Sequence, residues 1–214
     1  MTKVFVIALL GAESTGKTAL ANALATALAA PPGEPARRVA VVAEYLREFC
    51  DMYGRTPRRE EQTGIAAEQT RRIAAAVQDH DIVIADTTAV MIAVYSEHVF
   101  GDASLYASAL AAHARCDLTL LTALDLPWQA DGLQRDGPHV REPVDAAVRS
   151  ALMRANLAYS VVSGSGDARL EAALACVRRA LTPPPEADST QRWQWHCERC
   201  GDTACERHAL LPKA

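Results

Sequence analysis

The sequence predicts a three-layer α/β/α domain built on a central parallel sheet of about five strands. Short apolar runs of strand length alternate along the chain with longer segments of helical period. This alternation is typical of βαβ units whose sheet is covered by helices on both faces. The chain has 214 residues, half of them hydrophobic. That length suffices for one such domain and a small appendage, but not for two full domains.

The expected strands and helices alternate from the first residues to position 181. The strands are expected at residues 3–10, 39–43, 81–85, 117–121 and 159–162. The helices are expected at residues 17–30, 56–80, 89–114, 143–156 and 167–181. At the start of the second helix, Thr56 can cap the free amides and Pro57 suits the first helical position. Residues 183–189, PPPEADS, break the pattern, so we expect a main domain at 1–182, a proline-rich linker at 183–192 and a separate module at 193–214.

The overall charge argues against a nucleic acid partner. The net charge is −4 and the sequence pI is about 5.9, whereas binding to nucleic acid needs clustered basic residues. No run approaches the apolar length that crosses a bilayer, and the first residues enter a strand pattern without a charged leader. We therefore expect a cytoplasmic protein whose main partners are small molecules, and its assembly as a homo-oligomer is left open.

The stretch GAESTGKT, residues 11–18, lies between the first predicted strand and the first predicted helix. It fits GxxxxGK[ST] in the context that distinguishes a phosphate-binding loop from a plain glycine turn. Its backbone amides are expected to surround the β-phosphate of ATP. Lys17 would neutralise the β- and γ-phosphate oxygens, and Thr18 would place its hydroxyl on Mg²⁺. The expected ATP-binding residues are Gly11, Ala12, Glu13, Ser14, Thr15, Gly16, Lys17 and Thr18.

Two carboxylates follow predicted strands, at the sheet edge where ligands of parallel sheets gather. Asp86 follows the apolar run 82–85 as in a Walker B element, and would hold Mg²⁺ directly or through water. A helix-capping role is the alternative. Glu44 follows the strand at 39–43 and is placed to accept the proton of an acceptor hydroxyl. Arg47 and Glu48 could bind a polar acceptor, although a solvated amphipathic helix explains the same residues.

A long polar stretch, residues 126–141, follows the fourth predicted strand. Long loops in compact domains are often lids over an active site. Arg135 and Arg141 could close over the transferring phosphate, where guanidinium charge stabilises the transition state. Trp128 and Asp131 would shape the entrance. Solvated loop arginines are the alternative.

Four motifs occur in order: GAESTGKT, EYLRE at 44–48, IADTT at 84–88 and PWQADGLQR at 127–135. Together they resemble the ribosylnicotinamide kinase domain of NadR-type NAD-biosynthesis proteins and related small P-loop nucleoside and nucleotide kinases, over roughly residues 1–181. The resemblance implies a P-loop NTPase fold, ATP with magnesium, and phosphorylation of a ribosyl 5′-hydroxyl. It also implies that Glu44 is the base and that Asp86 lies near the metal.

The sequence departs from that family at both ends. It starts at the kinase strand, so we expect neither the DNA-binding nor the adenylyltransferase portion, and the cysteine-rich tail is no part of the pattern. A nicotinamide ring, which is cationic and aromatic, favours an aromatic shelf with a nearby carboxylate. Trp128 with Asp131, or Tyr45 with Glu48, could serve, and the sequence does not choose between these pairs.

The tail carries a candidate zinc site. Residues 196–208 read HCERCGDTACERH, and the four expected ligands are Cys197, Cys200, Cys205 and His208. Three thiolates and one imidazole are typical of structural zinc, and so short a segment would need the metal in order to fold. Incidental thiols in a disordered tail, or a redox pair, are the alternatives. A small Cys/His knuckle could also dock a protein partner.

Two functional hypotheses follow from these motifs. The first is a kinase that uses MgATP to phosphorylate a small acceptor. The second is an ATPase or nucleotide-dependent switch that acts on a macromolecule through the zinc tail.

For the tail, we predict about one equivalent of zinc per chain in protein purified without added metal. The substitution Cys200→Ser should lose the metal, because it removes one of four ligands. Elemental analysis of both proteins checks this, and zinc-free wild-type protein would contradict the assignment.

Overall fold

The computed structural model describes residues 3–33, 35–129 and 137–182. The chain divides into two units, Met1–Leu181 and Thr182–Ala214, and every element described here belongs to the first. All five predicted strands form, and they are parallel in the order β2-β3-β1-β4-β5. The strands are β1 (Phe5–Leu10), β2 (Val39–Val42), β3 (Ile82–Asp86), β4 (Leu118–Thr122) and β5 (Ser160–Val162).

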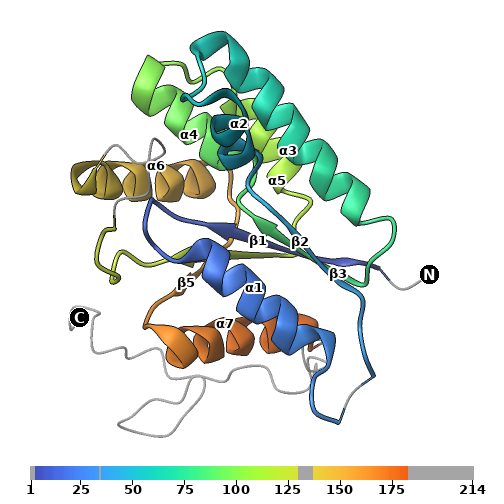
Figure 1. Ribbon diagram of the computed structural model, residues 1–214. Coiled ribbons are helices and arrows are strands. Elements are labelled where there is room, and N and C mark those ends of the chain that lie inside the picture. Colours follow the sequence, from blue (N-terminus) through green and yellow to red (C-terminus); the bar gives the residue numbers. More distant parts are fainter. Residues whose placement is uncertain (1–2, 34, 130–136, 183–214) are drawn as a thin grey trace, which may run out of the picture. The chain divides into compact units, whose positions relative to one another are not determined.

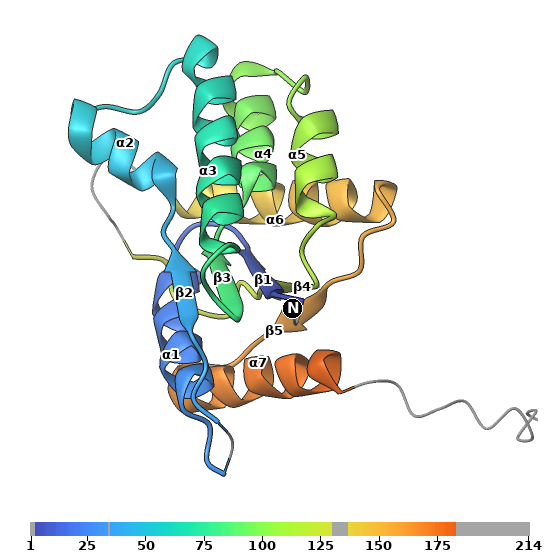
Figure 2. The ribbon, with the colours of Figure 1, turned by 90° about the vertical axis from the view of Figure 1, so that its right-hand side faces the viewer.

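Helices cover both faces of the sheet, as predicted (Figures 1 and 2). The helices are α1 (Lys17–Ala29), α2 (Tyr45–Tyr53), α3 (Gln62–Ala76), α4 (Ala89–Phe100), α5 (Tyr106–His113), α6 (Arg141–Arg154) and α7 (Gly166–Leu181). Two 3-10 turns, η1 (Arg59–Glu61) and η3 (Pro138–Val140), precede α3 and α6. Figure 1 shows α1 and α7 on one face of the sheet and α3 to α6 on the other.

The central strand β1 explains why the apolar runs are nearly continuous. Ile7 and Leu9 pack into a core cluster with α1 and α7, whereas Leu10 packs into a second cluster with α3, α4 and α6. Because successive side chains of a strand point to opposite faces, a strand between two helical layers must be apolar at every position. The two clusters hold the carboxyl ends of β1, β3 and β4 at one edge of the sheet.

Two of the predicted helices differ from the structure. The predicted helix cap at Thr56 is wrong, because the chain turns at Arg58 and α3 begins only at Gln62. The Glu61 carboxylate fixes this turn by accepting from the Arg58 amide at 2.7 Å and pairing with Arg55 at 2.6 Å. The helix expected at 89–114 is two helices, because Gly101 ends α4 in the left-handed region with φ 65°.

Residues 45–53 form helix α2, which begins one residue after Glu44. Within the described residues, no helix is long and apolar enough to cross a membrane.

The buried imidazole of His113 links α5 to the sheet and to the start of α4. Its Nδ1 lies 2.9 Å from the Thr88 hydroxyl, and its Nε2 lies 2.8 Å from the Thr119 hydroxyl. The Thr88 hydroxyl accepts from the Val90 amide, so its own proton is available to Nδ1. Burial lowers the pKa of His113 to about 4, so this imidazole is neutral at physiological pH.

We predict that His113 makes the fold sensitive to mild acid. The unfolded chain takes up a proton near pH 6.5, whereas folded His113 resists protonation down to about pH 4. Between those values the free energy of unfolding therefore falls as pH falls, by at most about 3 kcal/mol. Urea unfolding at several pH values should show this loss in the wild type and a smaller loss in His113→Gln. Identical pH dependence of the two proteins would contradict the prediction.

Candidate active site

The GAESTGKT loop joins the end of β1 to the start of α1. Gly11 has φ +146°, and a Cβ there would clash with Oγ1 of Thr122. Gly16, directly before α1, has φ +75°, and Ser14 between them has φ 54°. Three backbone positions in the left-handed region turn the loop back on itself, and two of them are glycines because a side chain is strained there.

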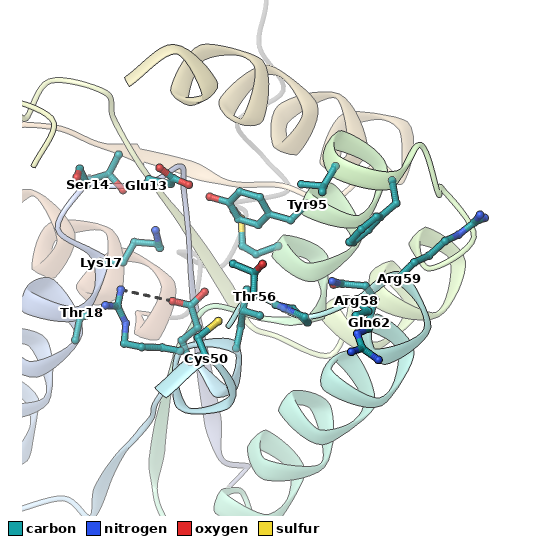
Figure 3. Close-up of a pocket in the computed structure, with 18 of the residues that line it drawn as sticks. Glu13, Ser14, Lys17, Thr18, Cys50, Thr56, Arg58, Arg59, Gln62 and Tyr95 are labelled. Carbon is teal, nitrogen blue, oxygen red and sulfur yellow. Dashed lines mark ion pairs between the residues drawn. The ribbon is translucent and has the colours of Figure 1, made fainter. Parts of the chain in front are cut away.

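The Lys17 side chain folds over the loop. Its ammonium donates to the carbonyl oxygens of Gly11 at 2.9 Å and Ala12 at 2.8 Å. In Figure 3 the Lys17 side chain extends into the cavity beside Glu13 and Ser14. A cation held in this position can neutralise a phosphate that enters the loop.

Thr122, at the end of β4, supports the loop from the sheet. Its Oγ1 lies 3.1 Å from the carbonyl oxygen of Leu10 and 2.7 Å from Oγ1 of Thr15. The Thr15 hydroxyl in turn donates to the carbonyl oxygen of Ala12 at 2.8 Å. All of these atoms are buried, so the hydrogen bonds are costly to break.

Arg169, near the start of α7, supports the same loop and is only 4% exposed. Its Nη1 donates to the carbonyl oxygen of Thr15 at 2.8 Å, and its Nε donates to that of Gly164 at 2.7 Å. Its Nη2 pairs with Asp125. One guanidinium therefore fastens the phosphate loop to the two loops that follow β4 and β5.

Thr18 and Asp86 meet at the carboxyl end of β3. The Thr18 hydroxyl donates to Oδ2 of Asp86 at 2.5 Å. The other carboxylate oxygen, Oδ1, is buried and has no hydrogen-bond partner among the described residues. A hydroxyl and a carboxylate oxygen are ligands that Mg²⁺ accepts beside waters and nucleotide phosphates. These two residues therefore fit the ion that the motif implies.

Glu44 lies between β2 and α2, on the rim of the same site. Burial raises the pKa of Glu44, and the nearby Asp86 carboxylate raises it further, whereas the Lys17 and Arg47 cations oppose the rise. Arg47 lies 3.9 Å from Glu44, and this ion pair is the dashed line in Figure 3. Glu44 is thus a poorly solvated carboxyl held near the phosphate loop, which favours proton transfer.

Tyr45 and Glu48 both contact Arg72 of α3. The Glu48 carboxylate accepts from Nη1 of Arg72 at 2.7 Å, and the Arg72 guanidinium lies 4.4 Å from the centre of the Tyr45 ring. Neither residue is among those that line the cavity described below. In this structure the pair proposed as a nicotinamide shelf therefore contacts α3.

A cavity of about 780 Å³ extends from the phosphate loop past α2 to the far end of α4. Its lining residues come from the phosphate loop, from Glu44 and α2, from the turn before α3 and from α4. Those on α4 are Met91, Tyr95, Val99 and Phe100, and those on the turn and α3 include Thr56, Arg58, Arg59 and Gln62. In Figure 3 the Tyr95 hydroxyl points toward the end of the cavity that carries Glu13 and Lys17.

The expected lid is only partly described. Asp131 and Arg135 lie outside the described residues. Ser14 binds the start of this stretch, since its hydroxyl donates to the Gln129 carbonyl at 2.8 Å and accepts from the Gln129 amide at 3.0 Å. Trp128 and Arg141 are not among the described cavity residues. The Nε and Nη2 of Arg141, which is 9% exposed, have no hydrogen-bond partner within the described ranges.

The expected zinc ligands Cys197, Cys200, Cys205 and His208 also lie outside the described residues. Within the residues that the structure describes, no group of three or more His, Cys, Asp or Glu side chains could hold a metal ion.

Several site residues did not emerge from the sequence. Met91, Tyr95 and Val99 follow one another at a spacing of four along α4, so they share one helix face. That spacing is a signal, but the surrounding helix is so apolar that the face is hard to separate from the core. Thr122 and Arg169 have no local signal, because their roles depend on contacts with the distant residue Thr15.

Comparison with solved structures identifies the fold. The NadR protein in complex with NR is 20% identical to this chain, with a TM-score of 0.68, and the match covers 86% of this chain and 52% of that one. The chain thus spans about half the length of that NadR chain. Thymidylate kinase from Ehrlichia chaffeensis is 14% identical, with a TM-score of 0.57, over 83% of this chain and 99% of its own.

A third match is deoxyadenosine kinase from M. mycoides with dcmp and dcdp bound, 11% identical with a TM-score of 0.54, over 82% of this chain and 99% of that one. No curated protein matches the chain in sequence. A family model described as an AAA domain matches residues 6–169. With its phosphate loop and five-stranded parallel sheet, the chain belongs to this AAA domain family and has the P-loop fold of NadR and the small nucleoside and nucleotide kinases.

Proposed function

We propose that the protein transfers the γ-phosphoryl group of MgATP to a hydroxyl group of a small nucleoside-like acceptor. The observation that carries this proposal is a single cavity that is lined by the phosphate loop, by Glu44 and by the α4 residues Met91 and Tyr95. A nucleotide phosphate, a base and room for a second small molecule are what a kinase of this kind needs. The ribose 5′-hydroxyl of ribosylnicotinamide is the first acceptor to test, because one matching NadR structure holds NR.

On the ATP side, the amides of residues 11–18 and the Lys17 ammonium bind the phosphates. Thr18 and Asp86 would hold Mg²⁺, and the bound ion would supply positive charge to the phosphate oxygens. Arg135 and Arg141 are the candidates for binding the transferring phosphoryl group. The buried nitrogens of Arg141 that have no partner among the described residues support this role, because a buried guanidinium requires an acceptor.

On the acceptor side, the ionised Glu44 carboxylate accepts the proton of the attacking hydroxyl. The acceptor oxygen forms a bond to the γ-phosphorus while the bond from that phosphorus to the ADP oxygen breaks. The proton of the hydroxyl ends on Glu44. Tyr95 and Phe100 offer aromatic surface for the ring of the acceptor.

The experiment that tests the function supplies MgATP and a panel of nucleosides, with ribosylnicotinamide included, and measures ADP release. We predict slow hydrolysis of ATP alone and rapid consumption with at least one acceptor. Lys17→Ala is the matched control and should lose turnover, because it removes the cation that holds the β- and γ-phosphates. If no acceptor accelerates ATP consumption and a macromolecular partner does, the protein is a switch rather than a small-molecule kinase.

We further predict that Glu44→Gln lowers kcat by roughly a hundredfold to ten-thousandfold while ATP affinity changes little. Because burial raises the pKa of Glu44, wild-type transfer should rise with pH through that pKa as the carboxyl loses its proton. This rise should be absent from the variant, since an amide does not titrate. Rate measurements with saturating MgATP across pH check both points, and a variant with normal kcat would reduce Glu44 to a positioning role.

A further inference from the structure

The side chain of Gln69 connects the two strand ends that carry Glu44 and Asp86. Gln69 lies on α3, and its residue is 0% exposed. Its Oε1 accepts from the Tyr45 amide at 2.7 Å, and its Nε2 donates to the carbonyl oxygens of Ala43 at 3.3 Å and Thr87 at 3.2 Å. The amide group therefore contacts the backbone on both sides of Glu44 and the residue that follows Asp86.

The backbone around Glu44 needs these bonds. The paired register of β2 and β3 ends at Val42 and Ala85, so Ala43 and Glu44 have left the sheet. The Tyr45 amide is in the first turn of α2, where helix amides have no partner within the helix. Gln69 supplies the hydrogen bonds that neither the sheet nor the helix provides, and it does so for the two residues that flank Glu44.

The backbone after Asp86 is strained. Thr87 has φ 73°, and a β-branched residue rarely adopts the left-handed region unless its surroundings enforce it. The Thr87 amide donates to the Leu9 carbonyl at 3.2 Å, while its carbonyl accepts from Gln69. These two bonds fix the peptide units on both sides of Thr87, and so fix the direction in which β3 leaves the sheet.

We infer that Gln69 is a positioning residue for phosphoryl transfer, which sets the Glu44 carboxylate relative to Asp86. It does not line the cavity among the described residues, so it acts through the backbone rather than on substrate. This inference rests on the proposed function, because it matters only if Glu44 and Asp86 act on the same reaction. It predicts that loss of Gln69 impairs the chemical step and spares the binding of ATP to residues 11–18.

The test uses two variants and one control. Gln69→Leu removes all three hydrogen bonds. Gln69→Glu keeps an acceptor for the Tyr45 amide but places an oxygen against the carbonyls of Ala43 and Thr87, so it carries the test if the leucine variant does not fold. The control is Val177→Ala. Val177 is a buried residue of α7 in the core cluster that contains Ile7 and Leu9, and it contacts neither Glu44 nor Asp86.

We predict that Gln69→Leu lowers kcat by about 100-fold, the scale of a displacement near 1 Å, while KM for MgATP changes less than about twofold. Gln69→Glu should lower kcat by at least about tenfold, and Val177→Ala should keep kcat within about twofold of the wild type. A purely structural role would leave kcat of both Gln69 variants at the level of the control, and that outcome would overturn the inference. So would an equal change in kcat and in KM for MgATP.

A second measurement separates this inference from the proposed function. Amide hydrogen exchange at Tyr45 should speed up in both Gln69 variants relative to Val177→Ala, with β1 still protected. If the wild type transfers phosphate to no acceptor, the proposed function fails, and exchange at Tyr45 alone decides whether Gln69 holds this backbone. Unchanged protection of Tyr45 would overturn the inference whatever the activity.

Discussion

The rest of the site depends on the fixed backbone of the phosphate loop. Gly11, Ser14 and Gly16 all have left-handed φ values, which a free loop would not maintain together. The loop keeps this shape because Thr122 and Arg169 bind its far side through buried hydrogen bonds. Donors that are already aimed cost no reorganisation when charge develops on a phosphate. Residues outside the loop therefore fix the geometry in which its amides could bind a phosphate.

The two glutamates of EYLRE show how the start of α2 divides the functions of neighbouring residues. In a helix, Glu44 and Glu48 would share a face, because they are four positions apart. Glu44 instead precedes the helix with extended backbone, φ −67° and ψ 109°. The helical repeat therefore does not place its side chain on the same face as that of Glu48. Glu44 lines the cavity, whereas Glu48 pairs with Arg72 on α3. The helix boundary is what separates a candidate base from a structural ion pair.

The sheet and the phosphate loop could be predicted because their signals are local. Strand-length apolar runs predicted all five strands, with each end within about two residues of its place in the structure, and the motif placed the loop at the end of β1. A helix end that depends on one residue was harder to predict. Gly101 alone ends α4, within a segment whose apolar sequence predicts one long helix. Gln69 and Arg169 were beyond prediction, because they bind backbone atoms that no side-chain pattern encodes.

The charges around the acceptor end of the cavity bear on which acceptor the proposed kinase would take. Arg47, Arg58 and Arg59 are among the described lining residues there, and the carboxylates are Glu44 and Glu60. A cationic ring such as nicotinamide gains from the face of Tyr95, and protonation of Glu44 would remove one nearby negative charge. The same proton that inactivates the base would then weaken the binding of a cationic acceptor more than that of a neutral nucleoside. The pH dependence of KM for the acceptor therefore reports the charge of the acceptor, separately from the pH dependence of kcat.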